Sequence, residues 1–177
     1  MKINLGCGNV KFKGFVNVDI RKDVEPDIID DVRSLTSFDS NSADLIYSCH
    51  VLEHFGRHEY KIVLKRWYDV LKPGGILKLS VPDLEKVFNL YCEKKYSLKQ
   101  LTGFLYGGQN YKENFHYIGF DFFTLKSDLE SLGFVEVKTW DWKSSEHSSY
   151  DDFSQAYLPH MDKKNGVLMS LNIQAKK

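Results

Sequence analysis

Two glycines and one acidic residue near the N-terminus have the types and spacing of a ligand site. Gly6 and Gly8 directly follow a short apolar run, where glycine allows a sharp turn and the close approach of a ligand. A second run, residues 15–19, ends in Asp19. An acid at that position can accept hydrogen bonds from both ribose hydroxyls of a cofactor that contains adenosine. We therefore predict an adenosine site at these residues.

The spacing of the same residues distinguishes between two cofactors. A dinucleotide site needs a third glycine, a helix whose N-terminus holds the pyrophosphate, and an acid about 20 residues further on. Here Lys11 stands at the third position, and Asp19 comes only thirteen positions after Gly6. This leaves no room for a normal first crossover helix. S-adenosyl-L-methionine contains adenosine but no phosphates, so the sequence favours it over NAD.

Further cofactor contacts are expected where later strands end. Asp30 and Asp31 follow the third run, and the period of two in a strand sends their side chains in opposite directions. We favour Asp31 as the acceptor for an adenine amino group, with Val32 supplying backbone contacts. His50 follows the fourth run, at the sheet edge where ligands bind in open α/β folds. The predicted cofactor-binding set is Leu5, Gly6, Cys7, Gly8, Asp19, Ile20, Asp31, Val32, Ser48 and His50.

Alternating strands and helices predict an α/β fold with a mostly parallel sheet. Short apolar runs separated by connectors are typical of strands that are buried on both faces. The expected strands are 2–5, 15–19, 27–31, 44–48, 75–81, 134–139 and 167–175. The expected helices are 58–71, 83–93, 97–106 and 124–132, the last with Thr124 as N-cap and Gly133 as C-cap. The long segment 140–166 is expected to be a functional loop.

Three motifs in the first half resemble a known family. They are Leu5-Gly6-Cys7-Gly8, Leu52-Glu53-His54 and Leu71-Lys72-Pro73-Gly74-Gly75, in this order between residues 2 and 82. The chain there resembles class I S-adenosylmethionine-dependent methyltransferases. The resemblance implies a Rossmann-like fold with strand order 3-2-1-4-5-7-6 and an antiparallel seventh strand. It also implies one domain, with a cofactor-binding half (1–82), helices and loops around the acceptor site (83–166) and a final strand (167–177).

The second half resembles a narrower group of little-characterised bacterial methyltransferases. Its motifs include Phe104-Leu105-Tyr106-Gly107-Gly108-Gln109 and Tyr157-Leu158-Pro159-His160-Met161-Asp162. This resemblance implies a role in surface-polysaccharide biosynthesis, with a sugar or polysaccharide precursor as acceptor. The chain departs from the general pattern because Asn4 stands where an acid is common and the first crossover helix is shortened or absent. We therefore expect residues 84–123 or a partner subunit to cover the cofactor site.

Methyl transfer to a hydroxyl often needs a general base. The candidates are His116, Asp121, His147, His160 and Asp162, because imidazole and carboxylate groups can accept a proton near neutral pH. Of these, we predict His116, His160 and Asp162 to be catalytic. A hydrogen-bonded structural histidine is the alternative for His116, and hydrogen bonding within the loop is the alternative for the other two. The predicted acceptor contacts are Tyr106, Gln109, Tyr117 and Tyr157. No metal site is predicted, and Glu53 is interpreted as a residue that caps backbone amides.

Composition and charge limit the class of protein. The 177 residues predict one domain, and 24 basic against 24 acidic residues argue against a nucleic-acid partner or a polybasic membrane anchor. There is no apolar run long enough to span a bilayer, so membrane insertion is not expected. Three scattered cysteines favour a reduced cytoplasmic location. The expected partner is a small-molecule or glycan acceptor, and a homodimer is reasonable.

Two other functions stay open at this point. The first is a cofactor-binding scaffold or regulatory subunit without catalysis, which the shortened crossover and Asn4 keep in consideration. The second is a methyltransferase that acts on protein or nucleic acid. Ser48-Cys49-His50-Val51 stands where base-amine methylases share an Asn/Asp-Pro-Pro-Tyr/Phe signature, which disfavours a nucleic-acid substrate.

Overall fold

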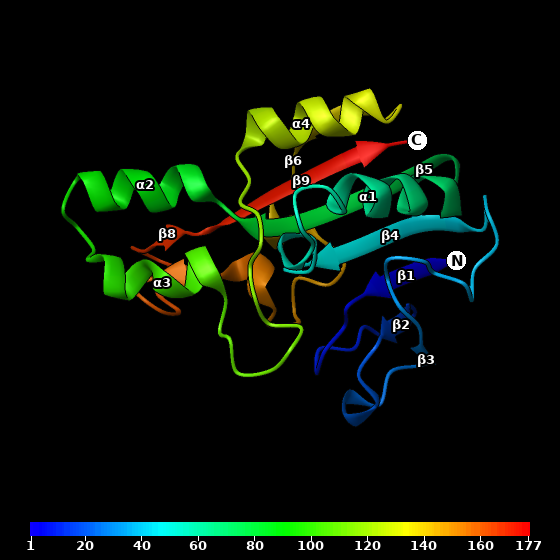
Figure 1. Ribbon diagram of the computed structural model, residues 1–177, viewed down its shortest axis with the longest axis horizontal. Coiled ribbons are helices and arrows are strands. Elements are labelled where there is room, and N and C mark those ends of the chain that lie inside the picture. Colours follow the sequence, from blue (N-terminus) through cyan, green and yellow to red (C-terminus); the bar gives the residue numbers. More distant parts are fainter.

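The computed structural model describes residues 1–177 and contains a seven-stranded sheet with the order β3-β2-β1-β4-β5-β9-β6 (Figure 1). Its strands are β1 (Lys2–Leu5), β2 (Val16–Asp19), β3 (Ile28–Ile29), β4 (Ala43–Cys49), β5 (Leu71–Pro82), β6 (Val135–Thr139) and β9 (Ser170–Lys176). Strands β1 to β5 are parallel to one another, and β9 runs antiparallel to both β5 and β6. The predicted strand order and the antiparallel last strand are confirmed.

Four helices occur at the predicted places. They are α1 (Tyr60–Val70), α2 (Leu84–Cys92), α3 (Leu98–Tyr106) and α4 (Phe122–Ser131). The predicted N-cap of α4 is wrong: Asp121 caps this helix, and its carboxylate accepts the backbone N–H of Thr124 at 2.8 Å. Asp121 is a better cap because its charged oxygen also favours the positive end of the helix dipole. None of these helices is long and apolar enough to span a bilayer.

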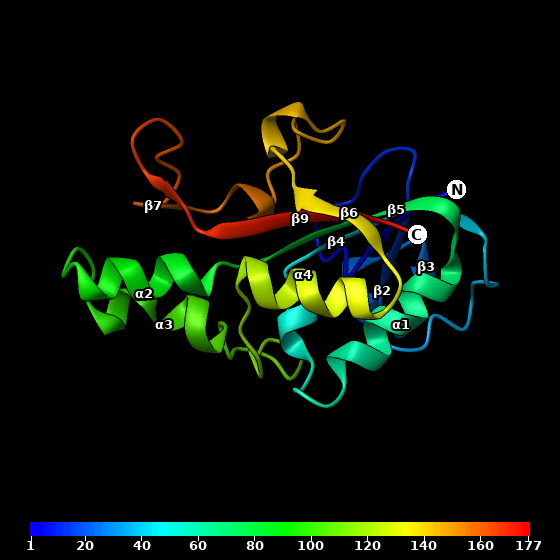
Figure 2. The ribbon, with the colours of Figure 1, turned by 90° about the horizontal axis from the view of Figure 1, so that it is seen from above.

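The sheet has helices on one face and a long connecting segment on the other. Figure 2 shows α1 and α4 on one side and the chain between β6 and β9 on the opposite side. Val63, Leu64, Trp67 and Val70 of α1 are buried against the sheet, and the Trp67 indole N–H donates to the Val32 carbonyl at 2.7 Å. This helix layer fixes the strands. The loops that follow the parallel strands therefore lie along one edge of the sheet.

The segment 140–166 packs on the sheet through aromatic side chains. Trp140 donates its indole N–H towards the carbonyls of Leu79 and Ile173, at 3.2 and 3.1 Å. The imidazole of His147 stacks on Phe12, with ring centroids 4.6 Å apart. The segment also contains β7 (Tyr157–Leu158), which pairs with β8 (Val167–Leu168). The predicted strand 167–175 is therefore divided between β8 and β9.

No helix lies between β1 and β2, as predicted. The amide side chain of Asn17 holds this connection instead: its Oδ1 accepts the backbone N–H of Phe12 at 2.8 Å and the Asn4 Nδ2 group at 3.1 Å. Strand β3 is shorter than predicted, and the carboxylates of Asp27 and Asp30 on either side of it accept backbone N–H groups of Asn17, Asp31 and Ser37. The edge of the sheet is thus built partly from side-chain hydrogen bonds.

Candidate active site

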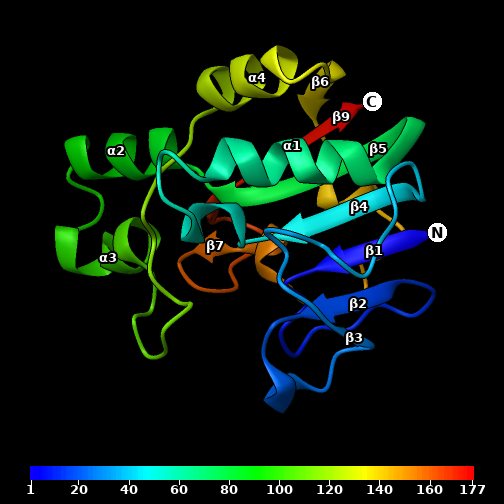
Figure 3. The same cartoon turned by 45° about the vertical axis from the view of Figure 1, so that its right-hand side comes forward.

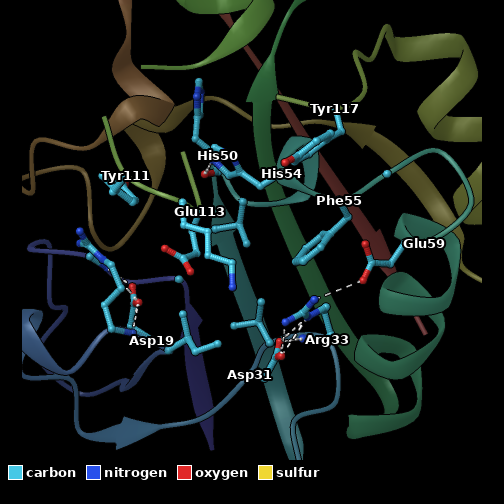
Figure 4. Close-up of a pocket in the computed structure, with 18 residues that line it drawn as sticks. Asp19, Asp31, Arg33, His50, His54, Phe55, Glu59, Tyr111, Glu113 and Tyr117 are labelled. Atoms are coloured by element: carbon cyan, nitrogen blue, oxygen red, sulfur yellow. Dashed lines mark hydrogen bonds and ion pairs between the residues drawn. The ribbon is translucent and has the colours of Figure 1, made fainter. Parts of the chain in front are cut away.

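The carboxyl ends of β1, β2 and β4 lie at one edge of the sheet (Figure 3). They open onto a cavity of about 530 Å³, which we call the first cavity (Figure 4). This volume lies within the range of roughly 300–1,000 Å³ that is typical of small-molecule sites. Its walls come from the loops after the strands and from residues 111–117. It is lined by Gly6, Gly8, Asp19, Ile20, Arg21, Asp31, Val32, Arg33, His50, Val51, His54, Phe55, Gly56, Glu59, Tyr111, Lys112, Glu113 and Tyr117.

The turn after β1 requires glycine at two positions. Gly6 and Gly8 have φ values of 63° and 50°, in the left-handed region that other residues adopt only with strain. A Cβ atom at Gly6 would lie 2.4 Å from Cγ2 of Val51. The turn therefore packs tightly against the loop after β4, and both segments line the first cavity.

Asp19 joins the turn after β1 to the end of β2. Its Oδ2 atom accepts the backbone N–H of Gly8 at 2.8 Å, and its Oδ1 atom accepts the backbone N–H of Arg21 at 2.9 Å. A carboxylate has about four lone-pair directions, so these two bonds leave acceptor capacity for a ligand. Only 7% of Asp19 is exposed, and it lies on the cavity wall.

Asp30 and Asp31 have different environments. Asp31 lines the first cavity, and its carboxylate pairs with Arg33 at 2.6 Å; hydrogen bonding from Arg33 lowers the pKa of Asp31. Asp30 is buried and accepts the backbone N–H groups of Asp31 and Ser37 at 2.7 and 2.8 Å. Of the two residues, only Asp31 lines the first cavity.

Most of the other predicted cofactor contacts also lie at this edge. Ile20, Val32 and His50 line the first cavity, whereas Leu5 and Ser48 are buried beneath it and line neither cavity described here. Cys7 lies on the far side of the glycine turn. Burial raises the pKa of its thiol to about 11, which keeps the sulfur neutral and fits packing better than nucleophilic attack.

A second cavity of about 670 Å³ adjoins the first. The two share Gly6, Gly8, Arg21, His50 and Tyr111 in their walls. The remaining walls of the second cavity are Asn4, Cys7, Asn9, Val10, Phe12, Tyr47, Cys49, Phe104, Asp151, Asp152, Phe153, Gln155, Ala156, Tyr157, Leu158, His160 and Met161. The segment 140–166 supplies nine of these residues, so it forms one wall of this cavity.

The candidate bases occupy three different environments. His160 lines the second cavity. Asp162 lines neither cavity and accepts the backbone N–H of Asn165 at 2.9 Å, which is hydrogen bonding within the loop. His116 also lines neither cavity, and its Nδ1 atom lies 3.0 Å from the carbonyl of Phe104. Only His160 is therefore placed to contact a molecule in the second cavity.

The four predicted acceptor contacts are divided in the same way. Tyr157 lines the second cavity and Tyr117 lines the first. Tyr106 and Gln109 line neither, because the turn after α3 directs the Gln109 amide back to the carbonyl of Tyr106 at 3.2 Å. The structure thus brings Tyr157 and His160 together and leaves Tyr106 and Gln109 outside.

The comparisons with known proteins agree with this architecture. Residues 12–79 match the family described as a methyltransferase domain. The fold is the Rossmann-like fold of class I methyltransferases. Among curated proteins, none matches the chain. The family match supports S-adenosyl-L-methionine as the cofactor.

Solved structures with this methyltransferase fold align over 99% of the chain. An S-adenosylmethionine-dependent methyltransferase from Archaeoglobus fulgidus aligns with a TM-score of 0.63, 19% identity and 85% of its own chain covered. One from Methanosarcina mazei gives 0.62, 17% and 91%. The 1,6-didemethyltoxoflavin-N1-methyltransferase of Burkholderia thailandensis, solved with 1,6-didemethyltoxoflavin and S-adenosylhomocysteine, gives 0.58, 14% and 70%. At these identities the likeness shows the fold.

Several residues that line the two cavities could not be predicted from the sequence pattern. Tyr111 lines both cavities, and the guanidinium of Arg21 lies 4.6 Å from the centre of its ring. In Figure 4, Tyr111 and Glu113 lie between Asp19 and His50. The segment that follows α3 therefore covers the site, which agrees with the expectation that residues 84–123 do so. Only the aromatic character of the second half could have indicated Tyr111.

His50 stands where the two cavities meet. Its φ of 52° is unusual for a residue other than glycine, and strained backbone of this kind is frequent at functional sites. Its Nδ1 atom lies 3.3 Å from Oε1 of Glu53, a residue that is fully buried in the short helix Leu52–His54. Burial lowers the pKa of His50 to about 3 and raises the pKa of Glu53 to about 8. Without a further positive charge, both groups are therefore mainly uncharged at pH 7.

Proposed function

We propose that this protein transfers a methyl group from S-adenosyl-L-methionine to a hydroxyl of a small polar acceptor, such as a sugar or a surface-polysaccharide precursor. The observation that carries the proposal is the pair of adjoining cavities, which meet at Gly6, Gly8 and His50. One cavity has the features of an adenosine site. The other has room for a second molecule on the opposite side of the glycine turn.

The residues of the first cavity fit the cofactor. The Asp19 carboxylate retains acceptor capacity for two ribose hydroxyls, and Asp31 with Val32 lies further out for the adenine ring. The first cavity contains no helix N-terminus that follows a glycine-rich loop, which a pyrophosphate would need. Gly6, Gly8 and His50, in the wall that both cavities share, would hold the rest of the cofactor.

The second cavity fits a polar acceptor with a flat apolar face. Phe153 and Tyr157 offer aromatic surfaces, and Asp151, Gln155 and His160 offer polar groups on the same wall. Bound cofactor supplies an electrophilic methyl group on sulfur. The second cavity holds the acceptor oxygen in line with that methyl group and limits the access of water. His160 would accept the proton of the acceptor hydroxyl as its oxygen takes the methyl group, and the cofactor would leave as S-adenosylhomocysteine.

The first experiment is a calorimetric titration of the purified protein with S-adenosylhomocysteine, with NAD as the control ligand. We expect saturable binding of S-adenosylhomocysteine alone. Release of S-adenosylhomocysteine from S-adenosyl-L-methionine is then measured with a panel of sugars and nucleotide-linked sugars. Absence of binding would overturn the cofactor assignment, and binding without turnover on any acceptor would favour a non-catalytic scaffold.

A further inference from the structure

The fully buried carboxyl group of Glu53 lacks a hydrogen-bond donor. Neither Oε1 nor Oε2 has a hydrogen-bond partner, and the residue has 0% exposure. Buried polar groups are almost always satisfied, and a buried carboxylate needs a positive charge or a proton beside it. Three histidines lie close by: His50, His54 and His116. No lysine or arginine pairs with Glu53 in the described chain.

The hydrogen bonds of His50 direct a lone pair at Glu53. The hydroxyl of Ser170 donates to the carbonyl of Phe153, so its oxygen is left to accept from Nε2 of His50 at 2.9 Å. With its N–H at Nε2, a neutral His50 presents an unprotonated Nδ1 atom. That atom lies 3.3 Å from Oε1 of Glu53. When Glu53 is ionised, two electron-rich atoms therefore face one another, and a proton or a cation is needed between them.

His116 presents a second lone pair to the same carboxyl oxygen. Its Nδ1 atom donates to the carbonyl of Phe104 at 3.0 Å, which leaves Nε2 unprotonated in the neutral ring. Nε2 lies 3.9 Å from Oε1 of Glu53. A histidine that donates one nitrogen to a backbone carbonyl and presents the other inward is the usual arrangement of a metal ligand.

His54 adds a third imidazole to the group. Its two nitrogens face the carbonyls of Phe115 and His50, at 3.0 and 3.1 Å. A neutral imidazole has one N–H, so one of these nitrogens presents a lone pair to an oxygen that also carries lone pairs. One ligand atom from each of Glu53, His54 and His116 lies within 4.8 Å of the other two. Nitrogen and oxygen lone pairs of these side chains therefore lie close together, and the structure places no lysine or arginine among them.

We propose that Glu53, His54 and His116 bind one Zn²⁺ ion, with a water molecule as the fourth ligand. Imidazole and carboxylate groups suit this ion, and four ligands satisfy its tetrahedral preference. Two ligands of one Zn²⁺ ion lie at most about 4.2 Å apart, which is twice a bond of about 2.1 Å. The 3.9 Å between His116 Nε2 and Glu53 Oε1 meets this limit. The ligand atom of His54 lies within 4.8 Å of the other two, so binding requires it to leave one backbone carbonyl and turn towards them.

The place of this cluster in the fold indicates that the ion would hold neighbouring segments together and would not take part in the reaction itself. Glu53 is fully buried and lines neither cavity, so the ion would not contact the acceptor. It would link the short helix Leu52–His54 to the segment after α3 and hold Glu53 beside His50, where the cavities meet. Figure 4 shows His50 and His54 at the same end of the first cavity, away from Asp31 and Arg33. Metal binding is measured directly and does not depend on the proposed methyl transfer.

The experiment measures Zn²⁺ binding to the full-length protein, produced without a polyhistidine tag and freed of metal with a chelator. We expect one equivalent of Zn²⁺ by elemental analysis and competition with a chromophoric chelator, and a higher melting temperature with the ion. Glu53→Gln and His116→Ala are expected to weaken binding at least tenfold. The control is His58→Ala, because His58 is exposed and lies outside the cluster.

Two further measurements keep the test independent of folding failures. Circular dichroism and S-adenosylhomocysteine titration show which variants fold. X-ray absorption of the Zn²⁺-loaded wild-type protein needs no variant and is expected to show nitrogen and oxygen ligands with imidazole outer-shell scattering. The proposal is overturned if the folded wild-type protein binds less than one equivalent at 0.1 mM Zn²⁺, or if folded variants bind as tightly as wild type. In either case a proton shared between Glu53 and His50 is the partner of the carboxylate.

Discussion

The carboxylate of Asp19 accepts the backbone N–H of Gly8 at 2.8 Å, which ties the end of β2 to the turn after β1. The same carboxylate accepts the backbone N–H of Arg21 with its other oxygen. Asp19 therefore shapes the first cavity and also lines it. A change at this residue is expected to affect both the turn and any ligand that the turn contacts.

Replacing Asp19 with alanine is expected to weaken S-adenosylhomocysteine binding. The loss of hydrogen bonds to a charged acceptor costs about 1.5–3 kcal/mol, which is roughly a tenfold to 150-fold change in Kd. Titration calorimetry measures the change, and circular dichroism checks folding. Asp23→Ala is the matched control, because Asp23 is exposed and lines neither cavity. Unchanged affinity in a folded Asp19 variant would remove this residue from the cofactor site.

Replacing Gly6 with alanine is expected to destabilise the protein. A residue with a side chain at a φ of 63° costs about 1–3 kcal/mol, and its Cβ would also meet Val51 at 2.4 Å. Chemical denaturation measures the free energy of unfolding. Gly103→Ala is the control: a Cβ atom added there would meet no other atom within 4 Å, and alanine in a helix is expected to stabilise by about 0.5–1 kcal/mol.

A double variant separates the two contributions at Gly6. Val51→Ala removes the atoms that the new Cβ would meet, so it should recover the steric part of the loss and leave the backbone strain. If Gly6→Ala is as stable as wild type, the tight packing of the two loops described here is wrong.

The pKa of Asp30 predicts part of the acid sensitivity. Burial opposes ionisation of this carboxyl, but hydrogen bonds from Ser37, Asp31 and Thr36 outweigh it and lower the pKa below 3.8. A lowered pKa in the folded state stabilises the protein above the unfolded pKa of about 3.9, and this stability is lost as the pH falls below that value. Asp30→Asn is therefore expected to cost about 1–3 kcal/mol at pH 7 and less at pH 3.

Denaturation curves of wild type and Asp30→Asn at pH 7, 5 and 3 measure this difference. The exposed Asp39 serves as the control position, since Asp39→Asn should change neither the stability at pH 7 nor its pH dependence. An equal loss for Asp30→Asn at every pH would show that ionisation of Asp30 does not contribute to stability.

The strands and helices could largely be predicted because their signals are local. Apolar runs such as 2–5 and 44–48 are short, buried and bounded by polar residues, and α1 repeats its buried positions every three or four residues. Predictions failed where a side chain competes with the backbone. The carboxylate of Asp121, for example, caps α4 and moves its start to Phe122.

The site was predictable only where its residues follow strands. Asp19 is the last residue of β2 and Asp31 lies two positions after β3, so their place at the sheet edge follows from the fold. Glu53 and His116 are separated by more than sixty residues and meet only because the segment after α3 returns to the short helix after β4. Tyr111 reaches both cavities from the same returning segment. Such contacts leave no periodic or spacing signal in a single sequence.

His160 is expected to contribute to turnover rather than to cofactor binding. It lines the second cavity and not the first, so His160→Ala should leave S-adenosylhomocysteine affinity unchanged. Loss of a general base lowers kcat by about 10²–10⁴. The rate of S-adenosylhomocysteine formation with an active acceptor measures this effect, with the exposed His58 changed to alanine as the control. A folded His160→Ala variant with the wild-type rate would assign the proton to another acceptor.

Tyr111 is expected to contribute to binding in both cavities through its ring rather than its hydroxyl. The ring lies 4.6 Å from the Arg21 guanidinium, and both residues form part of the wall between the cavities. Removing the ring loses a cation–π contact of about 0.5–1 kcal/mol together with the apolar surface that covers the cofactor. Tyr111→Ala should therefore weaken S-adenosylhomocysteine binding by roughly threefold to tenfold, whereas Tyr111→Phe should bind like wild type. Calorimetry of both variants measures this difference. If Tyr111→Phe loses as much affinity as Tyr111→Ala, the hydroxyl makes the contact and the stacking on Arg21 contributes little.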